Sequence, residues 1–91
     1  MAVEFDPEKR RATLDARGLD FAEAEEVFAG PNRTWIDDRI DYGESRYITA
    51  GWLRDRFVVV VWTPRNGKRR IISMRYGHDR ERRRFQALDR S

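Results

Sequence analysis

Two segments in the second half of the chain have the hydrophobic patterns of β-strands. In residues 46–52, Ile48, Ala50 and Trp52 alternate with other residues, which predicts a strand with one buried face. Residues 57–62 are apolar at every position and rich in valine, so they predict a central strand. That strand is either covered on both faces within the chain, or covered on one face and placed at an interface.

A hairpin signal precedes the last predicted strand. Asn66-Gly67 tolerates the positive φ angles of a two-residue turn, and residues 69–75 follow it as a strand. Strict alternation puts Arg75 on one face together with Ile71, and Arg70 on the opposite face. We therefore expect these two arginines to point away from each other.

Helices are predicted near both ends of the chain. Asp6 and Pro7 suit the start of a helix, as N-cap and first helical residue, and Gly18 suits its end. A second helix follows directly and stops at a Gly-Pro pair. The last dozen residues are also predicted to be helical, with Phe85 and Leu88 as their only apolar anchors.

These elements define a fold class. With weaker strands at residues 3–5 and 34–37, their order is β-α-α-β-β-β-β-α. Tight turns between consecutive strands predict an antiparallel sheet, with the N-terminal helical hairpin on one face and a C-terminal helix, which is an α+β fold. Because 91 residues supply one modest core, we expect residues 1–91 to form a single domain.

Charge is distributed unevenly along the chain. Residues 1–45 carry six basic and twelve acidic side chains, whereas residues 46–91 carry thirteen basic and four acidic ones. All the basic residues except Lys9 and Lys68 are arginines, whose planar guanidinium binds phosphate through two parallel hydrogen bonds. The basic second half, with aromatic residues among its arginines, indicates a polyanionic partner, most simply nucleic acid.

Other features of the composition narrow the function classes. The chain has no cysteine, which excludes disulfides, thiolate metal sites and a cysteine nucleophile. Its early acidic residues and short apolar runs predict no signal peptide and no membrane association, hence a cytoplasmic protein. Asp37, Asp38 and Asp41 come closest to a metal cluster, but they precede a glycine turn, so we expect no metal and no other cofactor.

Short motifs follow one another along almost the whole chain. They are Phe5-Asp6-Pro7-Glu8-Lys9, Gly18-Leu19-Asp20-Phe21-Ala22-Glu23-Ala24, Asp41-Tyr42-Gly43-Glu44-Ser45-Arg46, Val59-Val60-Val61-Trp62-Thr63, Arg70-Ile71-Ile72-Ser73-Met74-Arg75 and Glu81-Arg82-Arg83-Arg84-Phe85. In this order they resemble the BrnT family of RelE-like toxins. The resemblance implies a RelE-like fold and a ribonuclease toxin of a bacterial type II toxin–antitoxin system, which cleaves mRNA and arrests translation.

The resemblance also implies partners and shows departures. A small BrnA-like antitoxin would neutralise the toxin, and operator DNA would be reached only through that antitoxin. The family pattern has a histidine where this chain has Arg17, a lysine where it has Tyr76, and a tyrosine where it has Phe85. If those groups transfer protons in relatives, another group must do so here or the reaction must be slower.

Metal-independent RNA cleavage needs cations for the charge that grows on the phosphate. Arg75, at the end of its strand, is the preferred phosphate clamp; the alternative is a surface arginine packed on a neighbouring ring. Arg65 lies on the predicted hairpin and either engages RNA or is merely solvated. Arg46 is a further candidate, and a structural ion pair with Glu44 would explain it equally well.

The same reaction needs a base for the 2′-hydroxyl and an acid for the departing 5′-oxygen. His78 is a candidate because only histidine has an ordinary pKa near neutrality. Glu81 is expected to act as a base or to orient Arg84, with an exposed helix carboxylate as the alternative. The remaining residues expected to bind RNA are Arg70, Arg80, Arg83, Arg84, Lys9 and Arg17.

Three further points stay open at this level. Trp35, Trp52 and Trp62 are expected in the core, although one exposed ring could stack on a base or bury against the antitoxin. RNA could be cleaved free or on the ribosome, by a toxin that forms a hetero-oligomer with its antitoxin. The alternatives to an enzyme are a catalytically inactive module that binds nucleic acid or antitoxin, and an adaptor whose basic surface binds an acidic protein.

Overall fold

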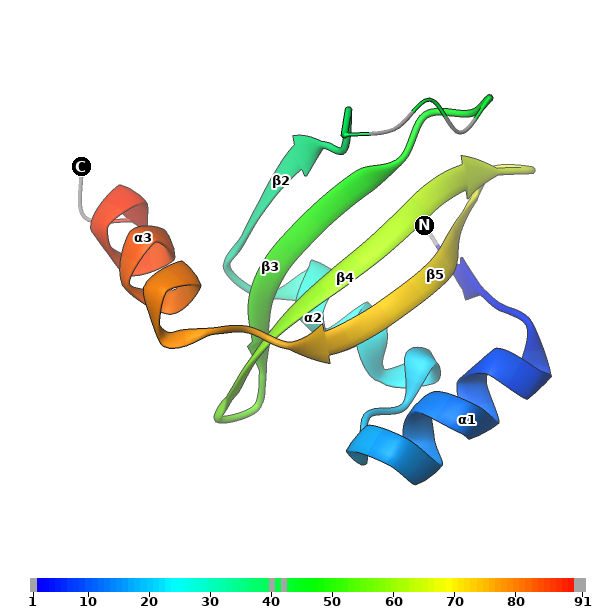
Figure 1. The fold of residues 1–91 in the computed structure, drawn as a ribbon, viewed down its shortest axis with the longest axis horizontal. Coiled ribbons are helices and arrows are strands. Elements are labelled where there is room, and N and C mark those ends of the chain that lie inside the picture. Colours follow the sequence, from blue (N-terminus) through cyan, green and yellow to red (C-terminus); the bar gives the residue numbers. More distant parts are fainter. Residues whose placement is uncertain (1, 40, 42, 90–91) are drawn as a thin grey trace.

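The computed structural model describes residues 2–39, 41 and 43–89, with side chains as far as residue 87. The elements, in chain order, are β1 (Val3–Glu4), α1 (Pro7–Arg17), the 3₁₀ turn η1 (Phe21–Glu23), α2 (Ala24–Ala29), β2 (Asn32–Ile36), β3 (Tyr47–Leu53), β4 (Arg56–Arg65), β5 (Lys68–Tyr76) and α3 (Asp79–Asp89) (Figure 1). The predicted α+β class and element order are confirmed. No helix in the described part of the chain is long and apolar enough to cross a membrane.

The five strands form one sheet in the order β1-β5-β4-β3-β2. From β2 to β5 each strand pairs antiparallel with the next, as the short connections predict. The first strand differs, because β1 pairs in parallel with β5, with Val3 opposite Arg69. The sheet is therefore mixed at that edge, and β2 forms the opposite edge.

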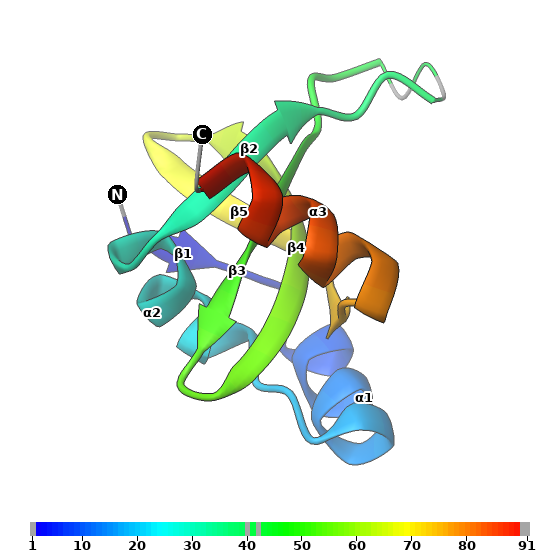
Figure 2. The ribbon, with the colours of Figure 1, turned by 90° about the vertical axis from the view of Figure 1, so that its left-hand side faces the viewer.

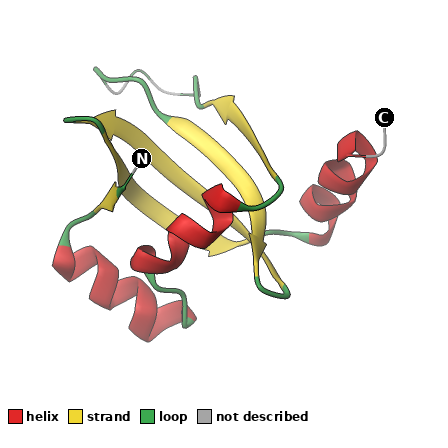
Figure 3. Cartoon of the chain, turned by 180° about the vertical axis from the view of Figure 1, so that it is seen from behind, coloured by secondary structure: helices red, strands yellow, loops and turns green. Residues whose placement is uncertain are grey.

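The helical hairpin covers one face of the sheet, as Figure 3 shows from behind. Asp6 caps α1 by accepting a hydrogen bond from the Glu8 amide at 2.9 Å, and Gly18 ends it with a φ of 68°. The core on this side joins residues of the hairpin to inward-facing residues of the strands. Its buried members are Leu19, Phe21, Ala24, Val27, Leu53, Val58, Val60, Trp62, Ile71 and Met74.

Helix α3 lies on the other face, in front of the sheet in Figure 2. Its buried anchor is Phe85, which packs on Ala50, Phe57 and Val59. Burying one such ring contributes roughly 1.5–3 kcal/mol, so the packing of α3 depends on few contacts. Leu88, the other predicted anchor, lies outside the described side chains. We call this side of the sheet, to which Ala50, Phe57 and Val59 point, the α3 face.

The valine-rich strand β4 is covered on both sides within the chain. Val58 and Val60 are buried under the helical hairpin, and Val59 is buried on the α3 face. The prediction of a central strand is confirmed, and of the two alternatives for its second face the structure shows cover within the chain, which α3 supplies over Val59 while Val61 stays half-buried. Among the described residues, the large apolar side chains that remain exposed lie elsewhere, and they are Leu14, Trp35, Ile36 and Tyr76.

A β-bulge corrects the predicted faces of β5. Between β4 and β5 the register shifts after Val61, so Val61 lies opposite Ser73 whereas Trp62 lies opposite Ile71. The extra residue in β5 reverses the alternation beyond it. Ile71 consequently faces the helical hairpin, and Arg70 comes to the α3 face. The prediction that Arg70 and Arg75 point to opposite faces is therefore wrong.

Candidate active site

Arginines from several elements lie on the α3 face. Arg75 lies opposite Val59, a residue buried on that face, and the bulge brings Arg70 to the same side. Arg33 lies opposite Ala50, which packs against Phe85, so it belongs to this face as well. Arginines from both halves of the chain, Arg33 from the first and Arg70 and Arg75 from the second, therefore share this face.

A two-bond ion pair joins Arg75 and Glu81 on this face. The two guanidinium nitrogens Nη1 and Nη2 of Arg75 donate to Oε1 and Oε2 of Glu81, both at 2.9 Å. Nη1 also donates to the Tyr76 carbonyl at 3.1 Å. This parallel geometry fixes the plane of the guanidinium and, since the bonds use only part of its donor set, leaves donors for a substrate.

The start of α3 determines where Glu81 lies. Glu81 stands in the first turn of the helix and accepts the backbone N–H of His78 at 2.8 Å, as the glutamate of a capping box does. The hydrogen bonds from Arg75, helped by this amide, lower the pKa of Glu81 from 4.5 to about 2 against the effect of burial. The same pair raises the pKa of Arg75. A carboxylate with so low a pKa is a weak base, so Glu81 is placed to position Arg75.

The Glu81 pair should make stability depend on pH. A carboxyl whose pKa is lower in the folded state stabilises the fold above its unfolded pKa, and this contribution disappears as the pH falls through its folded pKa. For Glu81 that window runs from pH 4.5 down to about 2. We expect the unfolding free energy of the wild type to fall by about 1–2 kcal/mol more than that of Glu81→Gln across this window, after allowance for solvent screening.

Urea unfolding at pH 5, 3 and 2 measures this difference. The matched control is Glu8→Gln, which removes an exposed carboxylate from the first turn of α1 and should follow the wild-type profile. If Glu81→Gln and the wild type lose stability in parallel, the Arg75–Glu81 pair contributes nothing to the fold.

A second arginine–carboxylate pair lies beside the first. Arg39 donates through Nε and Nη2 to the two oxygens of Asp37, at 2.8 and 2.9 Å, and the Asp37 side chain is 1% exposed. These bonds hold the pKa of Asp37 below its ordinary value, and the charge of Arg46 adds to the effect. The positive charge of Arg39 in turn lowers the pKa of Arg75, against the larger opposite effect of Glu81. Asp37 thus binds a guanidinium, and among the described residues no group of three or more potential metal ligands forms.

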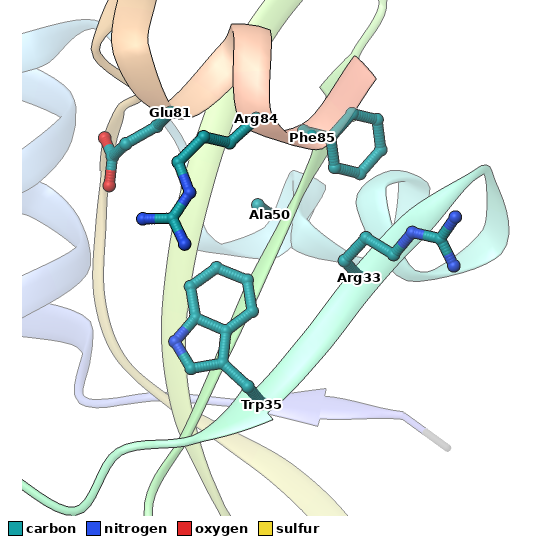
Figure 4. Close-up of a pocket in the computed structure, with 6 residues that line it drawn as sticks. All are labelled: Arg33, Trp35, Ala50, Glu81, Arg84 and Phe85. Carbon is teal, nitrogen blue, oxygen red and sulfur yellow. The ribbon is translucent and has the colours of Figure 1, made fainter. Parts of the chain in front are cut away.

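A pocket of about 390 Å³ opens between α3 and the sheet (Figure 4). It is lined by Arg33, Trp35, Ala50, Glu81, Arg84 and Phe85. In Figure 4 the guanidinium of Arg84 points toward the Trp35 indole, whereas that of Arg33 extends away from it. Because Glu81 both lines this pocket and binds Arg75, the pocket and the Arg75 guanidinium are neighbours.

The other predicted catalytic residues are His78 and Arg46, which lie near the two arginine–carboxylate pairs, and Arg65, which lies at the hairpin. His78 precedes α3 and is exposed, with its amide on Glu81 and its carbonyl accepting from Arg82. Arg46 is half-buried just before β3 and forms the ion pair with Glu44 at 3.5 Å that a structural role predicts. Arg65 is exposed where β4 enters the hairpin, opposite Lys68.

The predicted RNA-binding residues fall into two groups. Arg80, Arg83 and Arg84 are exposed on α3, and Arg70 lies on the α3 face in an ion pair with Glu4 at 3.6 Å. Lys9 and Arg17 belong to α1, on the other side of the sheet, where Arg17 donates to the Met74 carbonyl at 2.8 Å. Lys9 is exposed on α1, whereas Arg17 reaches β5 through this bond, at the residue before Arg75.

Sequence reasoning missed Arg33, Arg39 and the place of Trp35. The strand containing two of them starts at Asn32, two residues earlier than predicted. The spacing of Arg33 and Trp35 was the available signal, because residues two apart on a strand share a face. Nothing comparable marks Arg39, which lies in the loop after β2 and depends on Asp37 for its orientation.

Comparison with known proteins identifies the family of the chain. A search of curated proteins found no match to the chain. The family described as "Ribonuclease toxin, BrnT, of type II toxin-antitoxin system" matches residues 5–81, which include both Arg75 and Glu81. That match covers most of the sequence. The chain therefore belongs to the BrnT family of ribonuclease toxins of type II toxin–antitoxin systems.

Proposed function

We propose that this toxin is a metal-independent endoribonuclease that cleaves mRNA on its α3 face, free or on the ribosome. The 2′-oxygen would attack the adjacent phosphorus and the 5′-oxygen would depart. The observation that carries the proposal is the guanidinium of Arg75, held in a fixed plane by Glu81 among other arginines. Donors that are oriented before the reaction stabilise the charge that develops in the transition state most effectively.

The other predicted residues take roles consistent with their positions. Arg70 and Arg84 would hold the phosphates that flank the scissile one, and Arg46 and Arg65 would extend this contact along the sheet. His78, the only histidine, would exchange protons with the reacting oxygens, since its backbone amide already binds the carboxylate that holds Arg75. Glu81 would act as a positioning residue.

A type II system includes an antitoxin, and we propose a small DNA-binding partner similar to BrnA. An acidic segment of that partner would cover the basic surface of α3, on which Arg80, Arg83 and Arg84 are exposed. The toxin would thus reach operator DNA only within the hetero-oligomer. Such a complex would act in the cytoplasm, where mRNA is found.

Expression without the antitoxin should slow growth, and the purified toxin should cleave RNA in the presence of EDTA. Arginine guanidinium groups remain charged at any accessible pH, so removing divalent cations should leave the rate within about twofold. Denaturing gel electrophoresis of an end-labelled RNA, with and without EDTA, measures this and maps the cleavage site. Loss of cleavage with EDTA and its recovery on adding a divalent cation would contradict metal independence.

A catalytically inactive module that binds RNA or antitoxin is the second candidate. It is favoured by one observation, namely that the carboxylate nearest to Arg75 has a pKa of about 2 and is therefore a weak base. The double substitution Arg75→Ala, Glu81→Ala separates the two candidates. An enzyme would lose turnover first, whereas a binding module would show no turnover to lose and only weaker, less salt-dependent binding.

A further inference from the structure

The three tryptophans lie in different environments. Trp62 is 8% exposed, and its indole N–H donates to Thr49 at 2.8 Å. Trp52 packs edge-on against Phe57. Trp35 instead keeps 46% of its surface exposed. The residue opposite it on β3, Ile48, packs against the core. A large aromatic surface on an edge strand has thus been left uncovered next to the arginine cluster.

The surroundings of Trp35 match the chemistry of a nucleotide. Ala50 and Phe85 supply apolar walls of the pocket, and Arg84 lies across from the indole (Figure 4). The pocket volume of about 390 Å³ lies in the range of small-ligand sites. One flat ring beside guanidinium groups is the arrangement that binds single-stranded nucleic acid, in which bases stack on aromatics and cations follow the backbone.

We propose that Trp35 is a stacking platform for one unpaired base of the RNA substrate, adjacent to the scissile phosphate at Arg75. The phosphates on either side of that base would lie near Arg84, which lines the pocket, and near Arg75, which is bound by the pocket residue Glu81. The proposal rests on the proposed function, since it names how the same site holds its RNA. An RNA strand is favoured over an acidic protein segment because a peptide carboxylate would use the arginines but leave the indole face uncovered.

The test requires a substrate with a fixed register. We suggest an octanucleotide that spans the mapped cleavage site, with one ribose at the scissile position and 2′-deoxyribose elsewhere, so that only one bond can be cleaved. Abasic residues are then placed at each position in turn. For the wild type, one abasic position near the ribose should raise KM about tenfold and leave kcat within about twofold.

Substitution of the ring should reproduce this loss. Trp35→Leu should raise KM for the intact octanucleotide about tenfold and should no longer respond to the abasic residue at the sensitive position, because the two changes remove one contact. Trp35→Phe should keep KM within about threefold of the wild type. The control is Ile36→Ala, which alters the next exposed apolar side chain on the same strand and should change nothing.

Several other outcomes would overturn the proposal. An unchanged KM for Trp35→Leu, or a response to the abasic residue that persists in this variant, would overturn it. So would a Trp35→Leu variant that binds antitoxin more weakly but RNA normally, because the ring would then serve the protein partner. If the wild type does not cleave, no site can be mapped, and binding of a single-stranded all-deoxy octanucleotide of mixed sequence decides: tenfold weaker binding by Trp35→Leu supports the platform while the nuclease fails, and equal binding overturns both.

Discussion

Replacing Arg75 with alanine is expected to lower kcat/KM for RNA cleavage about 100- to 1000-fold, the usual loss when an oriented donor to transition-state charge is removed. The guanidinium held by Glu81 at 2.9 Å cannot be replaced by water, which is not fixed in place. Arg75→Lys should recover little of the activity, because an ammonium group lacks the planar pair of donors. Steady-state cleavage of the mapped octanucleotide measures both variants.

The fold should survive the Arg75 substitution. Glu81 is 32% exposed, so water can solvate its carboxylate once the guanidinium is gone, and the loss should stay near the roughly 1–2 kcal/mol expected for the pair, a thermal midpoint about 5–15 °C lower. Arg11→Ala is the matched control, since it removes an exposed arginine from α1 on the other side of the sheet. Cleavage by Arg75→Ala within about threefold of the wild type would refute the role assigned to Arg75.

Gly77→Ala should lower the unfolding free energy by about 1–3 kcal/mol and loosen α3. Gly77 joins β5 to α3 and donates its N–H to the Phe57 carbonyl at 2.9 Å. A methyl group here would overlap the ring of Phe57, which is buried and packs on Phe85. The ring must move, and with it the only described anchor of the helix that carries Glu81. Thermal unfolding should show a midpoint roughly 5–15 °C lower.

The steric cause can be isolated with a double substitution. Phe57→Leu removes the overlapping ring atoms, so Gly77→Ala should cost much less in that background than in the wild type, as expected for residues in contact. Additive losses would show that the effect comes from the backbone of Gly77 and not from the Phe57 ring. Cleavage activity should fall with the loosening of α3, because Glu81 would no longer hold Arg75.

Local signals in the sequence were sufficient for most of the elements. Asp6 and Gly18 bound the first helix because capping depends on a few adjacent residues, and the Asn66-Gly67 turn joins its two strands for the same reason. The all-apolar run in β4 indicated a central strand, and both faces of that strand are indeed covered. The parallel position of β1 was not predicted, since it is determined by a partner far away in the sequence.

The candidate site was predictable in its residue types and less so in its arrangement. Arg75 and Glu81 were both chosen from the sequence, but Glu81 was expected to act as a base or to orient Arg84. Its actual partner is Arg75, because the start of α3 turns the carboxylate back toward the end of β5. Lys9 and Arg17 were also chosen from the sequence, but nothing in the sequence indicates which face of the sheet their helix covers.

The sequence by itself thus determined the elements, their order and the presence of an arginine-rich surface, because each of these follows from short-range pattern and composition. Only the tertiary structure decided which arginines share that surface. One extra residue in β5 puts Arg70 on the same face of the sheet as Arg75. The loop after β2 brings the charge of Arg39 close enough to affect Arg75. The bulge, and the approach of the Arg39 loop to the end of β5, depend on how strands and helices pack together, and that packing leaves no periodic trace in the chain.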